Sequence, residues 1–146
     1  MSTTAPHPLM QRLAEQADAQ WVSQDTLPDW LQAAGGDAVL VVAGEPVRFP
    51  EGLDVAVVLP ELRQALGRPF RIGVVEARDQ DTIATRYGAQ RRPSLIFVRD
   101  GRYASTVAGM HDWTDYLALV RDALNHPTGP APLPIRAEGA AASGCA

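Results

Sequence analysis

The chain has 146 residues and a formal net charge of −4 at pH 7, because its 17 acidic side chains outnumber its 13 basic ones, all of them arginine. This length fits one domain with an ordinary core, and the acidic balance argues against a nucleic-acid-binding face. The longest apolar run is far too short to span a bilayer. The N-terminus lacks the basic and apolar segments of a secretory signal, so we expect a cytoplasmic location.

The first part of the chain predicts helices that alternate with strands. Apolar residues at helical spacing predict a helix over residues 8–19, and Trp21-Val22 follows as a short strand. Pro28 fits the first turn of a second helix, which ends at Gly35-Gly36. Residues 37–43 are apolar after the first residue, which indicates a strand that is covered on both faces and central in a sheet.

The middle of the chain predicts a loop, a long helix and a strand. Two prolines and two glycines in residues 44–52 predict the loop. Asp54 is expected to cap a helix over residues 55–66. Pro60 should kink this helix, because proline removes a backbone hydrogen bond. Residues 70–76 then alternate and become apolar, which indicates the strand.

Residues 94–108 predict a β-hairpin, preceded by a short helix over residues 82–88. Pro93 can open a strand but cannot lie inside a paired one, so the first strand begins just after it. Asp100-Gly101 supplies the positive φ angles of a tight turn, and the following residues return as the second strand.

The end of the chain predicts a helix and a tail. Asp112 is placed to cap the helix, and its inward face is expected to carry Trp113, Tyr116, Leu117, Val120 and Leu124. Prolines, glycines and alanines predict a disordered tail over residues 127–146, which leaves residues 1–126 as the folded domain. The single cysteine, Cys145, lies in this tail and cannot form an internal disulfide.

These elements form an α/β arrangement: a central mixed β-sheet flanked by helices, with a closing β-hairpin and a C-terminal helix. Together with Pro60 inside the long helix and Pro93 before the hairpin, this order resembles the thioredoxin fold. The resemblance implies that the Arg92-Pro93 peptide is cis.

The resemblance also places the residues that carry redox chemistry in thioredoxins. Their two cysteines, at the start of the kinked helix, would correspond to Gly52 and Val55, and their buried carboxylate to Val42. Since no cysteine precedes Cys145, we expect no thioredoxin-like catalysis at this place.

Several segments add a more specific resemblance. They are Trp21 with Asp29-Trp30-Leu31, Val58-Leu59-Pro60-Glu61-Leu62, Arg92-Pro93-Ser94-Leu95-Ile96-Phe97 and Gly109-Met110-His111-Asp112-Trp113. With the missing cysteines, they resemble the hydrogenase expression/formation proteins of the HyaE/HupG/HoxO type, thioredoxin-like chaperones of uptake NiFe hydrogenase maturation. The resemblance implies a non-enzymatic chaperone without a cofactor. It would bind the hydrogenase small-subunit precursor, through its twin-arginine signal peptide, before export, and other hydrogenase maturation proteins are further candidate partners.

The candidate partner-binding site is the loop and helix start where the cysteines are missing, with the turn at Pro93. Its residues are Glu45, Val47, Phe49, Glu51, Asp54, Glu61, Arg92 and Pro93. The carboxylates could bind arginine guanidinium groups, and the apolar side chains, with Leu53, could form a floor for the apolar part of a signal peptide. Alternatively, the acidic residues only solvate a loop and cap a helix.

Other functions remain open at this point. One alternative is a thiol-dependent redox protein that uses Cys145, and another is an adaptor that uses the same groove for a different partner. Arg91-Arg92 could bind an anion, although a solvated pair beside a turn is more common. His7, His111 and His126 lack the spacing of metal ligands, so no metal site is expected.

Overall fold

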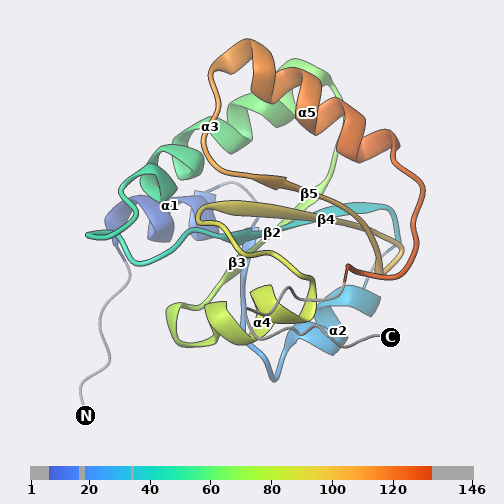
Figure 1. The fold of residues 1–146 in the computed structure, drawn as a ribbon, viewed down its shortest axis with the longest axis horizontal. Helices are drawn as coiled ribbons and strands as arrows, with labels where there is room; N and C mark the ends of the chain where they lie inside the picture. The colour runs from blue at the N-terminus through green and yellow to red at the C-terminus, as the bar shows by residue number, and fades with distance from the viewer. Residues whose placement is uncertain (1–6, 17–18, 34, 133–146) are drawn as a thin grey trace, which may run out of the picture.

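The computed structural model describes residues 7–16, 19–33 and 35–132, and its helices pack on both faces of one β-sheet (Figure 1). The elements in chain order are α1 (Pro8–Gln16), β1 (Ala19–Val22), α2 (Leu27–Gln32), β2 (Asp37–Val42), α3 (Glu51–Leu66), β3 (Arg71–Val75), the 3-10 helix η1 (Ala77–Asp79), α4 (Gln80–Arg86), β4 (Ser94–Arg99), β5 (Arg102–Ala108) and α5 (Trp113–Asn125). The predicted succession of helices and strands is confirmed.

Strand β2 lies at the centre of the sheet, whose strand order is β1-β3-β2-β4-β5. Strands β1, β3 and β2 run parallel, whereas β4 is antiparallel to β2 and β5 is antiparallel to β4. The last four side chains of β2, Val39, Leu40, Val41 and Val42, are each 0% exposed. A strand that is apolar on both faces requires cover on both, so the sheet forms the middle layer of the molecule.

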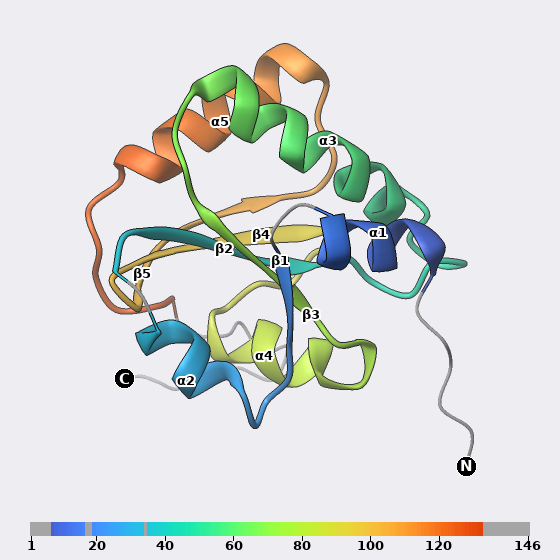
Figure 2. The same ribbon diagram turned by 180° about the vertical axis from the view of Figure 1, so that it is seen from behind.

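Helices α1, α3 and α5 cover one face of the sheet, and α2 and α4 cover the other (Figures 1 and 2). Successive side chains of a strand point to opposite faces, so β2 contributes to both cores. Val41 belongs to the core that contains Leu59 of α3 and Tyr116 of α5. Leu40 belongs to the second core, with Trp30 of α2. Among the described helices, none is long and apolar enough to cross a membrane.

The β4–β5 hairpin closes through the predicted two-residue turn. Asp100 and Gly101 have φ angles of 53° and 79°, both in the left-handed region that this type of turn requires. The register between the strands shifts by one residue at Phe97/Val98, so Ala104 is the additional residue of a β-bulge. The bulge was not predicted from the sequence, because alternation in β5 does not reveal where its partner strand slips.

The start of α3 differs from the prediction. The helix begins at Glu51, and Pro50 occupies the N-cap position with a φ of −61°. Asp54 therefore lies inside the first turn, and the prediction that it caps the helix is wrong. Proline suits a helix start because its φ is already helical and its missing N–H needs no partner there. Pro60 lies within α3, which continues through it to Leu66.

Several other boundaries also differ. Helix α1 ends at Gln16, because the chain already pairs as β1 at Ala19. Helix α4 begins at Gln80, directly after η1, two residues before the predicted start. Asp112 occupies the N-cap position of α5, but its side chain makes no capping hydrogen bond. Trp113 was predicted to face inward and is 43% exposed, because it lies in the first turn of the helix, beyond the edge of the core.

The structure continues past the predicted end of the domain. Residues 127–132 run back beneath the β4–β5 hairpin, on the side of α2 and α4 (Figures 1 and 2). The amide of Gly129 donates a hydrogen bond to the carbonyl oxygen of Tyr103 over 2.9 Å. The rest of the predicted tail, residues 133–146 with Cys145, lies outside the described residues.

Asp37, the first residue of β2, connects three elements. Its Oδ1 accepts a hydrogen bond from Nε of Arg99 (2.8 Å), and its Oδ2 accepts one from Nη2 of Arg68 (3.1 Å). Both guanidinium groups also donate to the carbonyl oxygen of Leu124, in the last turn of α5. The network thus places positive charge at the C-terminus of α5, where the helix dipole and the unpaired carbonyl groups favour it.

We expect Asp37→Ala to lower the free energy of unfolding by about 1–3 kcal/mol, because two partly buried guanidinium groups lose an ionised acceptor. Urea unfolding of the full chain measures this change. Asp122→Ala, at an exposed position of α5, is the control and should change the value by less than about 0.5 kcal/mol. Equal effects of the two substitutions would show that the network does not stabilise the fold.

Candidate functional site

The carboxyl ends of the three parallel strands lie at one end of the sheet, which we call the loop end. Val42, which ends β2, pairs with Ser94 of β4, and Ser94 pairs with Ala108, which ends β5. The loop end therefore gathers residues 43–50, 76–79, 89–93 and 109–112.

The chain leaves β2 and β3, which are neighbours, toward opposite faces of the sheet. The loop after β2 leads to α3 and the loop after β3 leads to α4 (Figures 1 and 2). In open α/β sheets, ligands bind where the loops of neighbouring parallel strands diverge in this way. A hydrogen bond of 2.9 Å from the amide of Gly44 to Oε1 of Gln80 connects the two loops.

Glu45 uses its carboxylate to order the loop after β2. The amide of Phe49 donates to the carbonyl oxygen of Glu45 over 2.8 Å, and this bond closes a turn. The carboxylate accepts the amides of Arg48 (2.9 Å) and Val47 (3.1 Å). These two bonds, that from Arg48 first, lower the pKa of Glu45 below its ordinary value of 4.5. The Glu45 carboxylate therefore orders its own loop, and its role in binding a partner stays a prediction.

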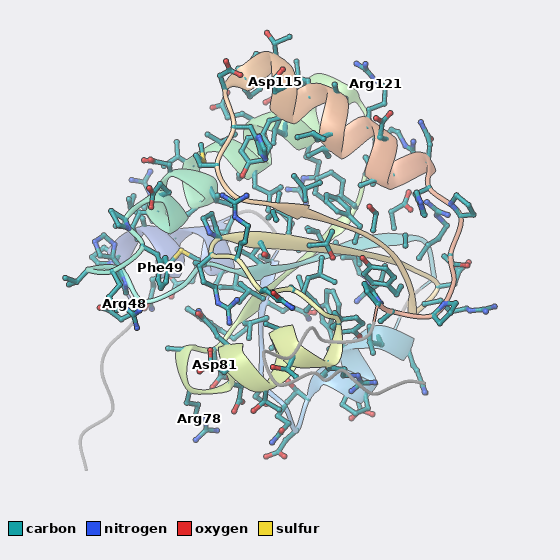
Figure 3. All side chains as sticks on the ribbon, viewed as in Figure 1. Arg48, Phe49, Arg78, Asp81, Asp115 and Arg121 are labelled. Carbon is teal, nitrogen blue, oxygen red and sulfur yellow. The ribbon has the colours of Figure 1, made fainter. Side chains whose placement is uncertain are left out.

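The same turn presents one apolar side chain to solvent and keeps another partly covered. Val47 is 86% exposed, whereas Phe49 is half-buried against Gly44, where a Cβ atom would lie 2.8 Å from the ring. The Arg48 guanidinium lies over the Phe49 ring, 5.3 Å from its centroid. Figure 3 shows Arg48 and Phe49 at one edge of the molecule, with Asp81 of α4 at the same edge.

The acidic residues of α3 fall into two places. Glu51 and Asp54 are exposed in the first turn, at the loop end, where negative charge complements the helix dipole. Glu61 is also exposed, but seven residues beyond Asp54 it lies about 10 Å further along the axis. There it lines a hollow between α1 and α3, with Leu9 and Arg12. The structure therefore brings Glu51 and Asp54 together with the loop, and does not bring Glu61 to them.

The turn before β4 has the predicted cis peptide between Arg92 and Pro93. The guanidinium of Arg92 donates to Oδ1 of Asp81 over 3.1 Å and also contacts the carbonyl oxygens of Ala89 and Arg91. Pro93 is buried, and its carbonyl oxygen accepts the amide of Gly109 over 2.8 Å. Both residues therefore connect segments of the loop end. Leu53, the further apolar candidate, is partly buried against the core.

The positions that hold cysteines in thioredoxins are closed to thiol chemistry here. A Cβ atom at Gly52 would lie 2.2 Å from the carbonyl oxygen of Ala43, so the first turn of α3 packs directly on the end of β2. Val55 is 1% exposed and Val42 is 0% exposed. None of the three positions carries a side chain that can donate or accept a proton.

Sequence reasoning missed Gln80 and Asp81. Both contact loops that lie far from them in the chain, Gly44 in one case and Arg92 in the other. The sequence offered no signal for these contacts. The predicted helix began two residues after Gln80, and the order of the strands in the sheet decides which loops Gln80 and Asp81 meet. The side-chain carboxylate of Asp81 is fully exposed, so its ion pair with Arg92 contributes little to stability.

Two further titratable groups near the loop end, His111 and Tyr116, have structural partners. Nε2 of His111 lies 2.8 Å from the carbonyl oxygen of Ala108, and its ring meets the edge of Tyr116. Burial raises the pKa of Tyr116 to about 12, and its hydroxyl donates to the carbonyl oxygen of Gly109. Within the described residues, no group of three His, Cys, Asp or Glu side chains is placed to hold a metal ion.

The chain is similar to proteins of hydrogenase biosynthesis. Residues 9–116 match the family model described as hydrogenase-1 expression protein HyaE. The hydrogenase expression/formation protein HoxO of Cupriavidus necator is 53% identical, over 98% of this chain and 90% of that protein. A solved structure described as the hydrogenase expression/formation protein HupG of Rhodopseudomonas palustris is 37% identical, over 72% of this chain and 94% of that one, with a TM-score of 0.50.

A second solved structure supports the fold alone. It is the complex of ferredoxin:thioredoxin reductase with thioredoxin f2, which is 20% identical over 73% of this chain and 96% of the matched chain, with a TM-score of 0.59. The thioredoxin-like fold expected from the sequence is therefore confirmed.

We expect Gly52→Ala to lower the free energy of unfolding by about 1–3 kcal/mol, because the new methyl group must displace backbone atoms at the end of β2. Urea unfolding measures the loss. Gly129→Ala is the matched control, since a Cβ atom at Gly129 has no atom within 4 Å. If both variants unfold at the same urea concentration as the parent, α3 does not pack on β2 as closely as described.

We expect the Glu45 carboxyl to titrate below pH 4.5, because its ionised form accepts two backbone amides. Its folded-state pKa is lower than its unfolded-state pKa, so its stabilisation of the loop is present above the unfolded value and is lost as pH falls through the folded value. In an acid titration followed by NMR, the amide chemical shifts of Val47 and Arg48 should change with the pKa of Glu45. If these chemical shifts change by the same amount in Glu45→Gln, the titrating group is not Glu45.

Proposed function

The chain belongs to the HyaE family of hydrogenase expression proteins, and from this premise we propose that it is a non-enzymatic assembly factor in maturation of an uptake NiFe hydrogenase. Its partner is the small-subunit precursor, which it holds in the cytoplasm before export. The bound segment is the twin-arginine signal peptide, and the binding surface is the loop end.

The observation that carries this proposal is the pair of exposed carboxylates on the first turn of α3. Glu51 and Asp54 are three residues apart, so they are neighbours on the helix surface. Neither forms an ion pair with another side chain among the described residues. A guanidinium group can bind carboxylates in a planar, paired geometry, and an arginine of the signal peptide fits this position.

The apolar part of a signal peptide also has a counterpart at the loop end. Val47 is 86% exposed, and the partly covered Phe49 lies in the same turn, which directly precedes α3 and its carboxylates in the chain. We propose that these two side chains contact the apolar part of the signal peptide. Because Glu45 fixes this turn by its own hydrogen bonds, the loop is ordered before the partner arrives, which lowers the entropic cost of binding.

The residues at the catalytic positions of thioredoxins support the proposed non-enzymatic role. Gly52 has no side chain, and Val55 is buried and apolar. A redox role would have to use Cys145, which lies outside the described residues. An adaptor for an unrelated partner would use the same surface. Selective binding of the small-subunit signal peptide would distinguish a hydrogenase assembly factor from such an adaptor.

We expect the variant Glu51→Gln with Asp54→Asn to bind the signal peptide of the small-subunit precursor at least tenfold more weakly at low salt. Two charged hydrogen-bonding groups are lost, whereas the fold loses only the helix-dipole interaction, about 0.3–1 kcal/mol for each residue. Fluorescence anisotropy of a labelled signal peptide measures the affinity. Binding to the parent should also weaken as salt increases, because the contact is exposed.

Asp115→Asn is the matched control for this experiment. Asp115 is likewise an exposed acid in the first turn of a helix, and Figure 3 shows it on α5, away from Arg48 and Phe49. The control should bind the peptide as the parent does. Should the double variant also bind with parental affinity, the arginine-binding role of the loop end is wrong. An unrelated peptide that binds equally well would favour the general adaptor.

A further inference from the structure

The segment that follows α5, residues 127–132, is held against the protein at two points, and the residue before it is held at a third. We call residues 127–132 the strap. Before it, Nη1 of Arg99 donates to the carbonyl oxygen of His126 over 3.0 Å. Within it, the amide of Gly129 donates to the carbonyl oxygen of Tyr103 over 2.9 Å. These contacts fix the direction of the strap beneath the β4–β5 hairpin (Figures 1 and 2).

The third contact lies at the end of the strap. Pro132 is so close to Gly88, the residue after the C-cap of α4, that a Cβ atom on Gly88 would lie 2.8 Å from the carbonyl oxygen of Pro132. Gly88 has a φ of +71°, a conformation that glycine adopts readily. A side chain at position 88 would therefore close the path along which the strap runs.

The surface under the strap combines a sheet edge with an aromatic wall. β5 is the edge strand, and an edge strand has main-chain groups that can pair with a further chain. The bond from Gly129 to Tyr103 is of the type by which extended peptides join such an edge. The rings of Tyr103 and Tyr87 stack with their centroids 6.1 Å apart, and Ala131 packs against the same core.

The strap has a simple chemical pattern. The residues that are partly covered are small, namely Thr128, Gly129 and Ala131, whereas all three prolines are exposed: Pro127, Pro130 and Pro132. Proline fixes φ and keeps a segment extended, so little entropy is lost when the segment docks. The strap places no large side chain in the core, so its local release costs much less than global unfolding.

We propose that this surface is a docking site for an extended segment of prolines interspersed with small residues, and that the strap is its occupant within the same chain. A partner protein with such a segment takes the place of the strap on the Tyr103 carbonyl group and the Tyr87–Tyr103 wall. The strap competes at a high effective concentration because it is attached, so the partner binds only when the strap is released. This site is separate from the loop end and does not depend on the function proposed there.

The test uses the full chain and a labelled heptapeptide with the sequence of residues 126–132. Gly129→Pro removes the amide that holds the strap, whereas the matched variant Gly129→Ala keeps this amide and has room for its methyl group. Fluorescence anisotropy should show the heptapeptide binding at least threefold more tightly to Gly129→Pro than to Gly129→Ala. A second heptapeptide, with proline in place of Gly129, should bind Gly129→Pro at least threefold more weakly than the first.

Equal affinities for the two variants, equal affinities for the two peptides, or no saturable binding up to millimolar peptide would each overturn the proposal. Self-association of the parent chain through exchanged straps would assign the surface to a second copy and would overturn the partner assignment. Replacing Glu51 and Asp54 by their amides should leave heptapeptide binding unchanged. The two proposals can therefore fail independently.

Discussion

The burial of β2 from Ala38 to Val42 is the constraint on which the rest of the molecule depends. Its apolar side chains on both faces require helices above and below the sheet. The chain leaves β2 toward α3 on one face and leaves the parallel strand β3 toward α4 on the other, and the connecting loops gather at one end. Gly52 completes this arrangement, because only a residue without a side chain lets α3 pack on the end of β2 at Ala43.

The loop end is ordered by side-chain hydrogen bonds. Glu45 bonds to the amides of its own loop, Gln80 bonds to the loop after β2, and Arg92 bonds to Asp81 of α4, so these side chains shape the surface. The exposed groups there include the carboxylates of Glu51 and Asp54 and the apolar side chain of Val47, together with the guanidinium groups of Arg48, Arg78 and Arg91. Such a surface is suited to binding an extended chain that carries positive charge, which is the role that we propose within the HyaE family.

The sequence predicted the order of elements and the sheet centre well, because apolar runs, prolines and the Asp100-Gly101 turn are local signals. It did not reveal contacts that are set by the sheet order, such as the bond between Gly44 and Gln80, or that Glu61 lies beside α1, because the helix carries it away from the loop. Glu45 accepts two amides of its own turn, and its role toward a partner stays a prediction. The docking of residues 127–132 also escaped prediction, since a proline-rich composition describes the isolated chain and not the surface beneath it.

The central claim is that the loop end receives the signal peptide of the precursor. Amide chemical-shift mapping of the isotopically labelled full chain, with the small-subunit precursor added, tests it most directly. We expect the largest chemical-shift changes in residues 44–54 and 78–81, on both sides of the Gly44–Gln80 hydrogen bond. Changes confined to the hollow between α1 and α3, or to the β4–β5 hairpin, would contradict it.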